Sequence, residues 1–161
     1  MGATPAATLK GKVVGVTDGD TVVVLDDQHQ NHRVRLAGID APEKHQAHAE
    51  RAHQQLAGWV HGRQVLVHHD HKDRYGRVVG QVWVNGQDIN LAMVQHGWAW
   101  HYRAYAQEQS PEDRVRYAHA EQHARLARSG LWAGPAPTAP WLFRSAKSAV
   151  RTPPQGAPEP R

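Results

Sequence analysis

Short runs in which apolar and polar residues alternate dominate the first half of this chain, and a period of two is typical of half-buried strands. β-Branched residues fill the runs 9–16 and 21–25, which flank the acidic turn Asp18-Gly19-Asp20. The pattern predicts a strand, a tight turn and a second strand. Two further strands are predicted at 63–71 and 78–84, and the second of them ends in the turn dipeptide Asn85-Gly86.

A strand predicted at 31–36 carries arginines on one face. Val34 and Leu36 alternate there with Arg33 and Arg35. Because successive side chains of a strand point to opposite faces, the arginine face is not expected to be the core.

The helical pattern is different, with apolar residues recurring at threes and fours. It predicts one helix from about Gln46 to Val60, stopped by Gly62. Asp88 is expected to cap a short helix that runs through His96 and is buried all round.

The last predicted helix opens at Ser110-Pro111, which combines a capping serine with proline at the first helical position. Its inner stripe is predicted from the apolar spacing, and Gly130 is expected to end it. Leu131 and Trp132 are then expected to dock back on the core. The predicted stripe consists of Val115, Ala118, Gln122 and Leu126.

These elements predict one α+β domain. Five strands with a helix inserted after the third fit a five-stranded Greek-key barrel of the OB type with about three packed helices. The chain has 161 residues, and we expect the domain to cover 8–144. Residues 1–7 are expected to be a flexible segment, and the Pro-, Ala- and base-rich residues 145–161 a disordered tail.

Composition narrows the class of partner only a little. The formal charge is +4 with thirteen histidines, which favours a polyanion such as nucleic acid. There is no cysteine, so disulfides and thiolate metal sites are excluded. No apolar run is long enough to span a bilayer. The first residues lack the features of a signal peptide, which fits a cytoplasmic start or a secreted or periplasmic protein whose leader was removed.

Three short segments concentrate the charged residues. They are Asp18-Gly19-Asp20-Thr21, the stretch from Arg35 to Asp40-Ala41-Pro42-Glu43, and Asp73-Arg74-Tyr75-Gly76-Arg77. Alone, the first would be explained by a β-turn, since Asp and Gly dominate turns. Together, we expect the three loops to meet and to bind a divalent cation and a phosphodiester.

In this order and at these separations the three segments resemble the staphylococcal nuclease (thermonuclease) family. The resemblance runs from about Leu9 to Trp132 and includes Gly97-Trp98-Ala99-Trp100. It implies an OB-barrel nuclease that uses Ca²⁺ to hydrolyse DNA and RNA, leaves 3′-phosphate and 5′-hydroxyl ends, and has little sequence preference. Single-stranded or locally open DNA and RNA are the implied partners, with a monomer as the implied state.

The resemblance also implies a metal site. Asp20 and Asp40 match the metal-binding carboxylates, hard oxygen donors that suit Ca²⁺. Ala41 matches a position that supplies a backbone carbonyl, although many members have threonine there. Asp18 is expected behind these ligands, where it orients the turn.

The implied catalytic groups are a carboxylate and two guanidinium groups. Glu43 matches the proposed general base, and an acid that merely begins a helix is the alternative interpretation. Arg35 and Arg77 match the cations that stabilise charge on the phosphoryl oxygens. We expect these three residues to line one pocket with Asp20 and Asp40.

Substrate-binding residues are implied as well. Arg74, in place of the usual lysine, and Tyr75 match positions that hold a terminal phosphate. Tyr102 and Tyr105 lie near the base-stacking tyrosines, and a structural role is the alternative for both.

Other classes of function remain open at this point. A non-catalytic nucleic-acid- or protein-binding module could use the same barrel, and a metallohydrolase could act on a small phosphodiester. His68-His69-Asp70-His71 resembles a transition-metal motif, but the chain is histidine-rich throughout, and chance clustering explains it better.

Overall fold

The structure is a computed structural model, and it describes residues 7–151. Three antiparallel strands come first: β1 (Ala7–Asp18), β2 (Thr21–Leu25) and β3 (Asn31–Leu36). β5 (Gln64–Lys72) pairs with the other edge of β1, and β6 (Val78–Val84) pairs with β5.

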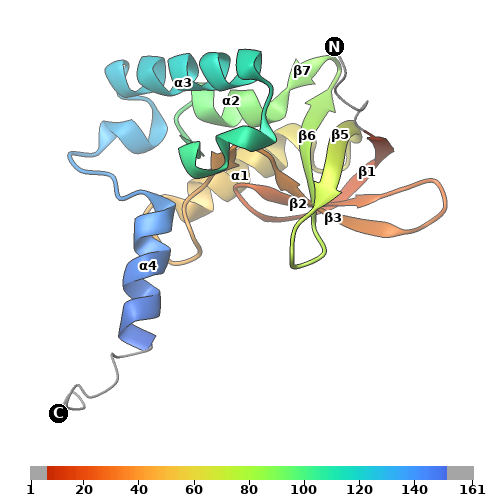
Figure 1. Cartoon of the computed structure of the whole chain (residues 1–161), viewed down its shortest axis with the longest axis horizontal. Helices are drawn as coiled ribbons and strands as arrows, with labels where there is room; N and C mark the ends of the chain where they lie inside the picture. Colours follow the sequence, from red (N-terminus) through yellow and green to blue (C-terminus); the bar gives the residue numbers. More distant parts are fainter. Residues whose placement is uncertain (1–6, 152–161) are drawn as a thin grey trace.

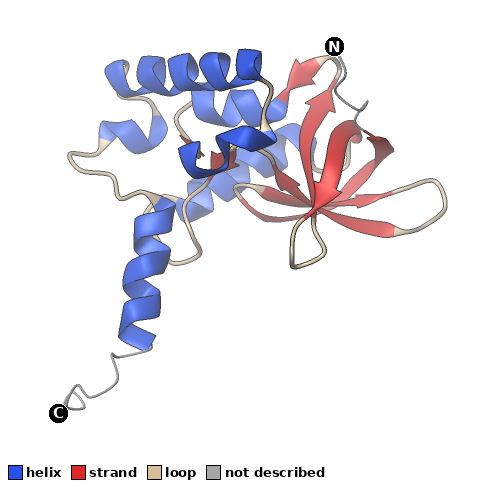
Figure 2. Ribbon diagram, in the orientation of Figure 1, coloured by secondary structure: helices blue, strands red, loops and turns tan. Residues whose placement is uncertain are grey.

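The sheet closes on itself. β3 also pairs in parallel with β6, so that β1, β2, β3, β5 and β6 form a five-stranded barrel. Closure leaves no open edge between the first and last strands of the barrel. The predicted OB-type α+β fold is confirmed, and Figure 2 shows the strands gathered on one side of the molecule and the helices on the other.

The barrel core consists of the inward-facing apolar residues that the alternation predicted. Six of them are completely buried: Val22, Val24, Val34, Leu36, Val67 and Val82. Burying a side chain of this size contributes about 1.5–3 kcal/mol relative to leaving it exposed. The core therefore holds rigid the turns and loops that emerge from the strands.

Three short strands lie beside the barrel and bring the later chain to it. β4 (Ile39–Asp40) pairs with β8 (Trp100–His101), and β7 (Gln87–Asp88) pairs with the end of β6. The β4–β8 pair places the segment after Trp100 against the loop that contains Asp40.

Helices cover one side of the barrel (Figure 1). α1 (Ala49–Val60) packs on β1, and α2 (Ile89–Gln95) lies between α3 (Pro111–Leu126) and β6. The 3₁₀ segments η1 (Arg103–Glu108) and η2 (Gly130–Ala133) flank α3. No helix among residues 7–151 has both the length and the apolar character that a membrane span requires.

The two predicted helix N-caps are confirmed, whereas α3 ends at Leu126 and not at Gly130. The Asp88 side chain accepts a hydrogen bond from the Leu91 N–H, and Ser110 does the same for Asp113. α1 begins later than predicted, at Ala49, because His45 and His48 take left-handed backbone conformations with φ of 73° and 69°. Those two residues form a turn where the apolar spacing predicted helix.

The predicted inner stripe of α3 is wrong. Val115 and Leu126 are 55% and 78% exposed, whereas Tyr117, Ala120, Glu121 and Ala124 are buried. The Tyr117 hydroxyl donates to the Asp88 carboxylate at 2.7 Å, and Glu121 accepts from the His101 N–H at 2.7 Å. Polar side chains take the inner face because each finds a buried partner there. The predicted docking of Leu131 and Trp132 on the core is confirmed.

The chain after α3 differs from the expected tail. α4 (Pro140–Arg151) continues past Ser145, so that the expected disorder does not begin there, and residues 152–161 lie outside the described part. α4 projects from the body next to the loop that follows β4 (Figure 1). Proline at its first position is compatible with a helix start, and its first residues contact the body.

Candidate active site

The turn between β1 and β2 holds Asp20 against the loop after β4. The Asp20 N–H donates to Asp18 Oδ1 at 3.0 Å, which closes the turn on itself. In return, Asp20 Oδ2 accepts from the Ala41 N–H at 3.0 Å, and Oδ1 accepts from the Thr21 hydroxyl at 3.1 Å. The bond to Ala41 brings together two segments that are 21 residues apart in the sequence.

Close packing keeps this turn near Ala41, and Gly19 is the residue that permits it. A Cβ at Gly19 would lie 2.7 Å from the Ala41 Cβ and 3.0 Å from the Ala52 Cβ. The small side chain of Ala41 belongs to the same contact.

Gly19→Ala is therefore expected to destabilise the protein. Overpacking of this kind costs about 1–3 kcal/mol, because the backbone of the turn or of α1 has to shift. Gly58→Ala is the matched control, since nothing lies within 4 Å of a Cβ added there in α1. That change should stabilise the helix by about 0.5–1 kcal/mol. Urea denaturation of both variants measures the two effects, and a Gly19→Ala protein as stable as the parent would contradict this packing.

Burial and charged neighbours shift the pKa values of three carboxyl groups in this region, those of Asp18, Asp20 and Asp40. Burial, with the charge of Asp20 beside it, raises the pKa of Asp18 to about 8. Burial also raises the pKa of Asp40 to about 6, although Arg144 and Arg35 oppose the rise.

Asp20 behaves in the opposite way. Its burial alone would raise the pKa, but a hydrogen bond from Asp18, the charge of Arg35 and the Ala41 N–H hold that pKa below its ordinary value. The Asp18–Asp20 pair thus favours a proton on Asp18 and a charge on Asp20. A charged Asp20 is what a cation site at this turn requires.

Arg35 is buried beside these carboxylates. Its side chain comes from β3 on the same face as Arg33, yet Arg35 is only 8% exposed because η1 covers that end of the strand. Its guanidinium donates to the Ile39 carbonyl at 3.2 Å and lies 3.6 Å from Glu108 Oε1. Glu108 also accepts from the Gly38 N–H at 3.2 Å, so it anchors both Arg35 and the loop.

A cavity of about 540 Å³ opens on the other side of Arg35. Arg74, Tyr75, Arg77 and Tyr105 line it together with Arg35. The cavity is large enough for a nucleotide-sized ligand.

Arg77 is fixed in this cavity by its own loop. Its Nε donates to Asp73 Oδ2 at 2.7 Å, and Asp73 Oδ1 accepts from the Arg77 N–H at 2.9 Å. The sequence pattern did not predict that Asp73 holds Arg77 in place, although both residues belong to the same charged segment. Spacing was the available signal, because an acid four residues before an arginine can close such a loop.

The aromatic residues of the site lie in two environments. Tyr75 and Tyr105 are 58% and 44% exposed at the cavity, and Arg74 Nη2 donates to the Tyr75 hydroxyl at 2.7 Å. Tyr102 lies outside the cavity lining. Its N–H donates to the Gly38 carbonyl at 2.8 Å, and its ring centroid is 5.9 Å from the Arg35 guanidinium carbon.

The sequence-predicted residues thus form two adjoining groups. Asp18, Asp20, Asp40 and Glu43 form the carboxylate group, and Arg74, Tyr75, Arg77 and Tyr105 line the cavity. The carboxylates do not line that cavity, so the prediction that Arg35, Glu43 and Arg77 share one pocket with Asp20 and Asp40 is wrong. Arg35 belongs to both groups, since it lines the cavity and its charge also opposes the effect of burial on the pKa values of Asp20 and Asp40.

One residue that contacts the carboxylate group was missed by sequence reasoning. Arg144, on α4, donates to Asp40 Oδ1 at 3.0 Å and to Oδ2 at 2.7 Å. It also donates to Glu43 Oε1 at 2.6 Å. No local signal marks this arginine, because its partners lie more than a hundred positions earlier in the chain.

The donor set fits a hard divalent cation better than a transition metal. The carboxylates of Asp20 and Asp40 and the Ala41 carbonyl are all oxygen donors, which Ca²⁺ prefers. Among residues 7–151, no three or more His, Asp or Glu side chains are arranged to hold a metal ion by themselves. A metal here would thus rely on a backbone carbonyl and water, as Ca²⁺ accepts. The guanidinium of Arg144 on Asp40 shows that a positive charge suits this place.

Comparison with known proteins gives the same family as the resemblance of the three charged segments. Residues 33–134 match the family described as "Staphylococcal nuclease homologue". The chain is 48% identical over 152 residues to "Protein ParB" of Escherichia coli, which covers 88% of this chain and 83% of that protein.

Two other relatives carry names that state an activity. "Micrococcal nuclease" of Shigella flexneri is 44% identical over 149 residues, covering 87% of this chain and 83% of the relative. An "Uncharacterized endonuclease" of Escherichia coli is 39% identical over 142 residues, covering 88% of each chain. With this identity over most of both chains and a family match over residues 33–134, the chain belongs to the staphylococcal nuclease homologue family and is a nuclease of that family.

Proposed function

We propose that the protein is a Ca²⁺-dependent nuclease that hydrolyses the phosphodiester bonds of DNA and RNA with little sequence preference. Its products carry 3′-phosphate and 5′-hydroxyl ends. The observation that supports this proposal most directly is the position of Arg35, between buried carboxylates on one side and a nucleotide-sized cavity with Arg77 on the other.

Asp20, Asp40 and the Ala41 carbonyl would hold the Ca²⁺. Bound there, the ion supplies positive charge that stabilises the oxygens of the scissile phosphate. A charged Asp20 suits this task, and the low pKa of Asp20 keeps it charged at neutral pH.

Arg35 and Arg77 bind the non-bridging oxygens of the same phosphate. Both guanidinium groups carry permanent charge and donate in a planar fork that matches phosphate geometry. Asp73 holds Arg77 and the Ile39 carbonyl holds Arg35, so neither side chain has to be ordered when substrate arrives. Preorganised donors of this kind are each worth about 10²–10³-fold in rate.

Glu43 takes the proton from the attacking water. The oxygen of that water forms the new bond to phosphorus, the bond from phosphorus to the 5′ oxygen breaks, and solvent supplies the proton that the 5′ oxygen needs. Arginine is a poor acid near neutral pH, which is why solvent rather than Arg77 is assigned this last step.

Tyr75, Tyr105 and Arg74 bind the rest of the substrate. Exposed tyrosine rings at the cavity can stack on any base, at about 1–3 kcal/mol per base, and such stacking does not discriminate sequence. Arg74 adds charge for a neighbouring phosphate. This combination favours a flexible single strand over a rigid duplex.

A metal series tests the proposal. Single-stranded DNA and RNA are incubated with the protein in Ca²⁺, in Mg²⁺ and in chelator, and the product ends are mapped by their susceptibility to phosphatase and to 5′-kinase. Cleavage is expected with Ca²⁺ and not with chelator, with 5′ ends that accept a phosphate from the kinase at once. Turnover that persists in chelator would overturn the metal-dependent proposal.

A further inference from the structure

Arg144 forms ion pairs with Asp40 and Glu43, the proposed metal ligand and the proposed general base. The guanidinium uses both oxygens of Asp40, at 3.0 and 2.7 Å, and reaches Glu43 Oε1 at 2.6 Å. Bidentate pairs of guanidinium and carboxylate are among the stronger polar contacts in proteins. Asp40 is buried and Arg144 is half-buried, so water screens this pair less than a surface pair.

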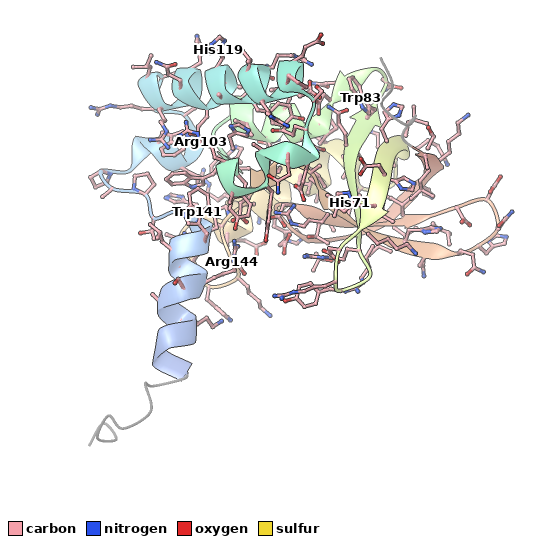
Figure 3. All side chains as sticks on the ribbon, viewed as in Figure 1. His71, Trp83, Arg103, His119, Trp141 and Arg144 are labelled. Atoms are coloured by element: carbon pink, nitrogen blue, oxygen red, sulfur yellow. The ribbon has the colours of Figure 1, made fainter. Side chains whose placement is uncertain are left out.

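The same helix also contacts Tyr102, one of the candidate substrate-binding residues. The Trp141 indole stacks on the Tyr102 ring with centroids 5.1 Å apart and planes only 3° from parallel. This is the geometry in which a nucleic-acid base stacks on tyrosine. Figure 3 shows Trp141 and Arg144 at the end of α4 that meets the body.

The segment before α4 is tied to the Glu43 loop. The Gln46 side chain accepts from the Glu43 N–H at 2.9 Å and donates to the Thr138 carbonyl at 2.6 Å. The connection to α4 therefore stays near the site even when Arg144 leaves Asp40. Release of the guanidinium requires movement of the helix or of one side chain, and not unfolding of the domain.

Arg144 and a divalent cation cannot share Asp40 in this arrangement. Both carboxylate oxygens face the guanidinium, and a dication on the same oxygens would lie against a permanent positive charge. The two cations therefore compete for one carboxylate. Whichever binds more tightly sets the state of the site.

We propose that Arg144 is an internal competitor of Ca²⁺ and that α4 is a latch, with Trp141 over Tyr102 and Arg144 on Asp40 and Glu43, which Ca²⁺ displaces. This inference rests on the proposed function, because it takes Asp40 to be a ligand of Ca²⁺. The latch holds the nuclease inactive at low Ca²⁺ and raises the Ca²⁺ concentration at which the site fills. It also explains why a positive side chain is placed on the carboxylate meant to activate water.

Arg144→Gln tests the latch, with Lys147→Gln as the matched control because Lys147 is exposed on the same helix. Ca²⁺ binding is measured by calorimetry in the absence of nucleic acid. A latch closed in about 90% of molecules weakens the apparent affinity about 10-fold. We therefore expect Arg144→Gln to bind Ca²⁺ about 10-fold more tightly, and Lys147→Gln to bind it like the parent.

Hydrogen exchange supplies a second measurement. Adding Ca²⁺ to the parent protein should speed exchange of the α4 amides, because Arg144 loses its anchor. In Arg144→Gln, these amides should exchange fast with or without Ca²⁺. Exchange in α1 should stay unchanged in both proteins.

The possible results separate this inference from the proposed function. Equal Ca²⁺ affinity of parent and Arg144→Gln would overturn the latch and leave the nuclease proposal standing. A lower kcat of Arg144→Gln at saturating Ca²⁺, with unchanged affinity, would also overturn it and assign Arg144 to the substrate. If neither protein bound Ca²⁺ and neither cleaved DNA, the proposed function would fail together with the latch.

Discussion

Arg35→Lys is expected to lower kcat on single-stranded DNA by about 10²–10³-fold, the loss typical of removing one donor that stabilises transition-state charge. The guanidinium of Arg35 donates to the Ile39 carbonyl and at the same time faces the cavity that Arg77 lines. An ammonium group keeps the charge, but as a point charge it cannot hold the carbonyl and fork onto a phosphate together. KM should change less than kcat, because the lost contact is made mainly in the transition state.

The measurement is steady-state kinetics at saturating Ca²⁺. Arg116→Lys is the matched control, since Arg116 pairs with Asp113 on α3 and lies outside the cavity lining. The melting temperature of each variant shows whether the buried Arg35 is also needed for folding. A folded Arg35→Lys protein with the parent kcat would contradict the role assigned to this guanidinium.

Glu43→Gln is expected to lower kcat by about 10²–10⁴-fold, the contribution usual for a positioned general base. The amide keeps the size of the side chain and removes its ability to take a proton. Because the neutral amide would also hold Arg144 less firmly than the carboxylate does, kcat is compared at saturating Ca²⁺, where the latch is open in both proteins. Binding of a short single-stranded DNA, followed by fluorescence anisotropy, should change little.

Glu50→Gln serves as the control for this substitution. Glu50 is exposed in the first turn of α1, where its carboxylate interacts with Gln54 and His53 of the same helix. A Glu43→Gln protein that turns over nearly as fast as the parent would leave Glu43 with no part in proton removal. In that case a helix-entry acid would be the better description of this residue.

Much of the barrel could be predicted from the alternation of residues. Each barrel strand has one face in water or against helices and one face in a common core, so the sequence must alternate. The turn at Asn85-Gly86 was predicted for a local reason too, and both residues take positive φ, 50° and 77°. Helix caps at Asp88 and Ser110 are local in the same sense.

α3 is the element where apolar spacing misled. Sequence reasoning placed Leu126 inside and took no account of Tyr117 and Glu121, which are both buried. Their partners, Asp88 for Tyr117 and the His101 N–H for Glu121, come from other elements. A polar group that finds such a partner is no longer costly to bury, and the sequence of α3 alone does not contain that information.

The candidate site also has features that the sequence predicts and features that depend on the fold. The three charged segments and the residue types within them are properties of the sequence, because metal, phosphate and water each demand particular donors. The arrangement of those segments is not, since it arises only when closure of the barrel brings the turn at Asp20 beside Ala41.

The sequence by itself thus determined the strands, the turns and the chemical inventory of this nuclease, because those depend on neighbours along the chain. Only the tertiary structure decided that Arg35 would be buried between two groups, that Asp73 would fix Arg77, and that Arg144 would bind Asp40. The physical reason is that electrostatic and packing energies depend on distance in space. That distance is set by the whole fold and not by any one segment.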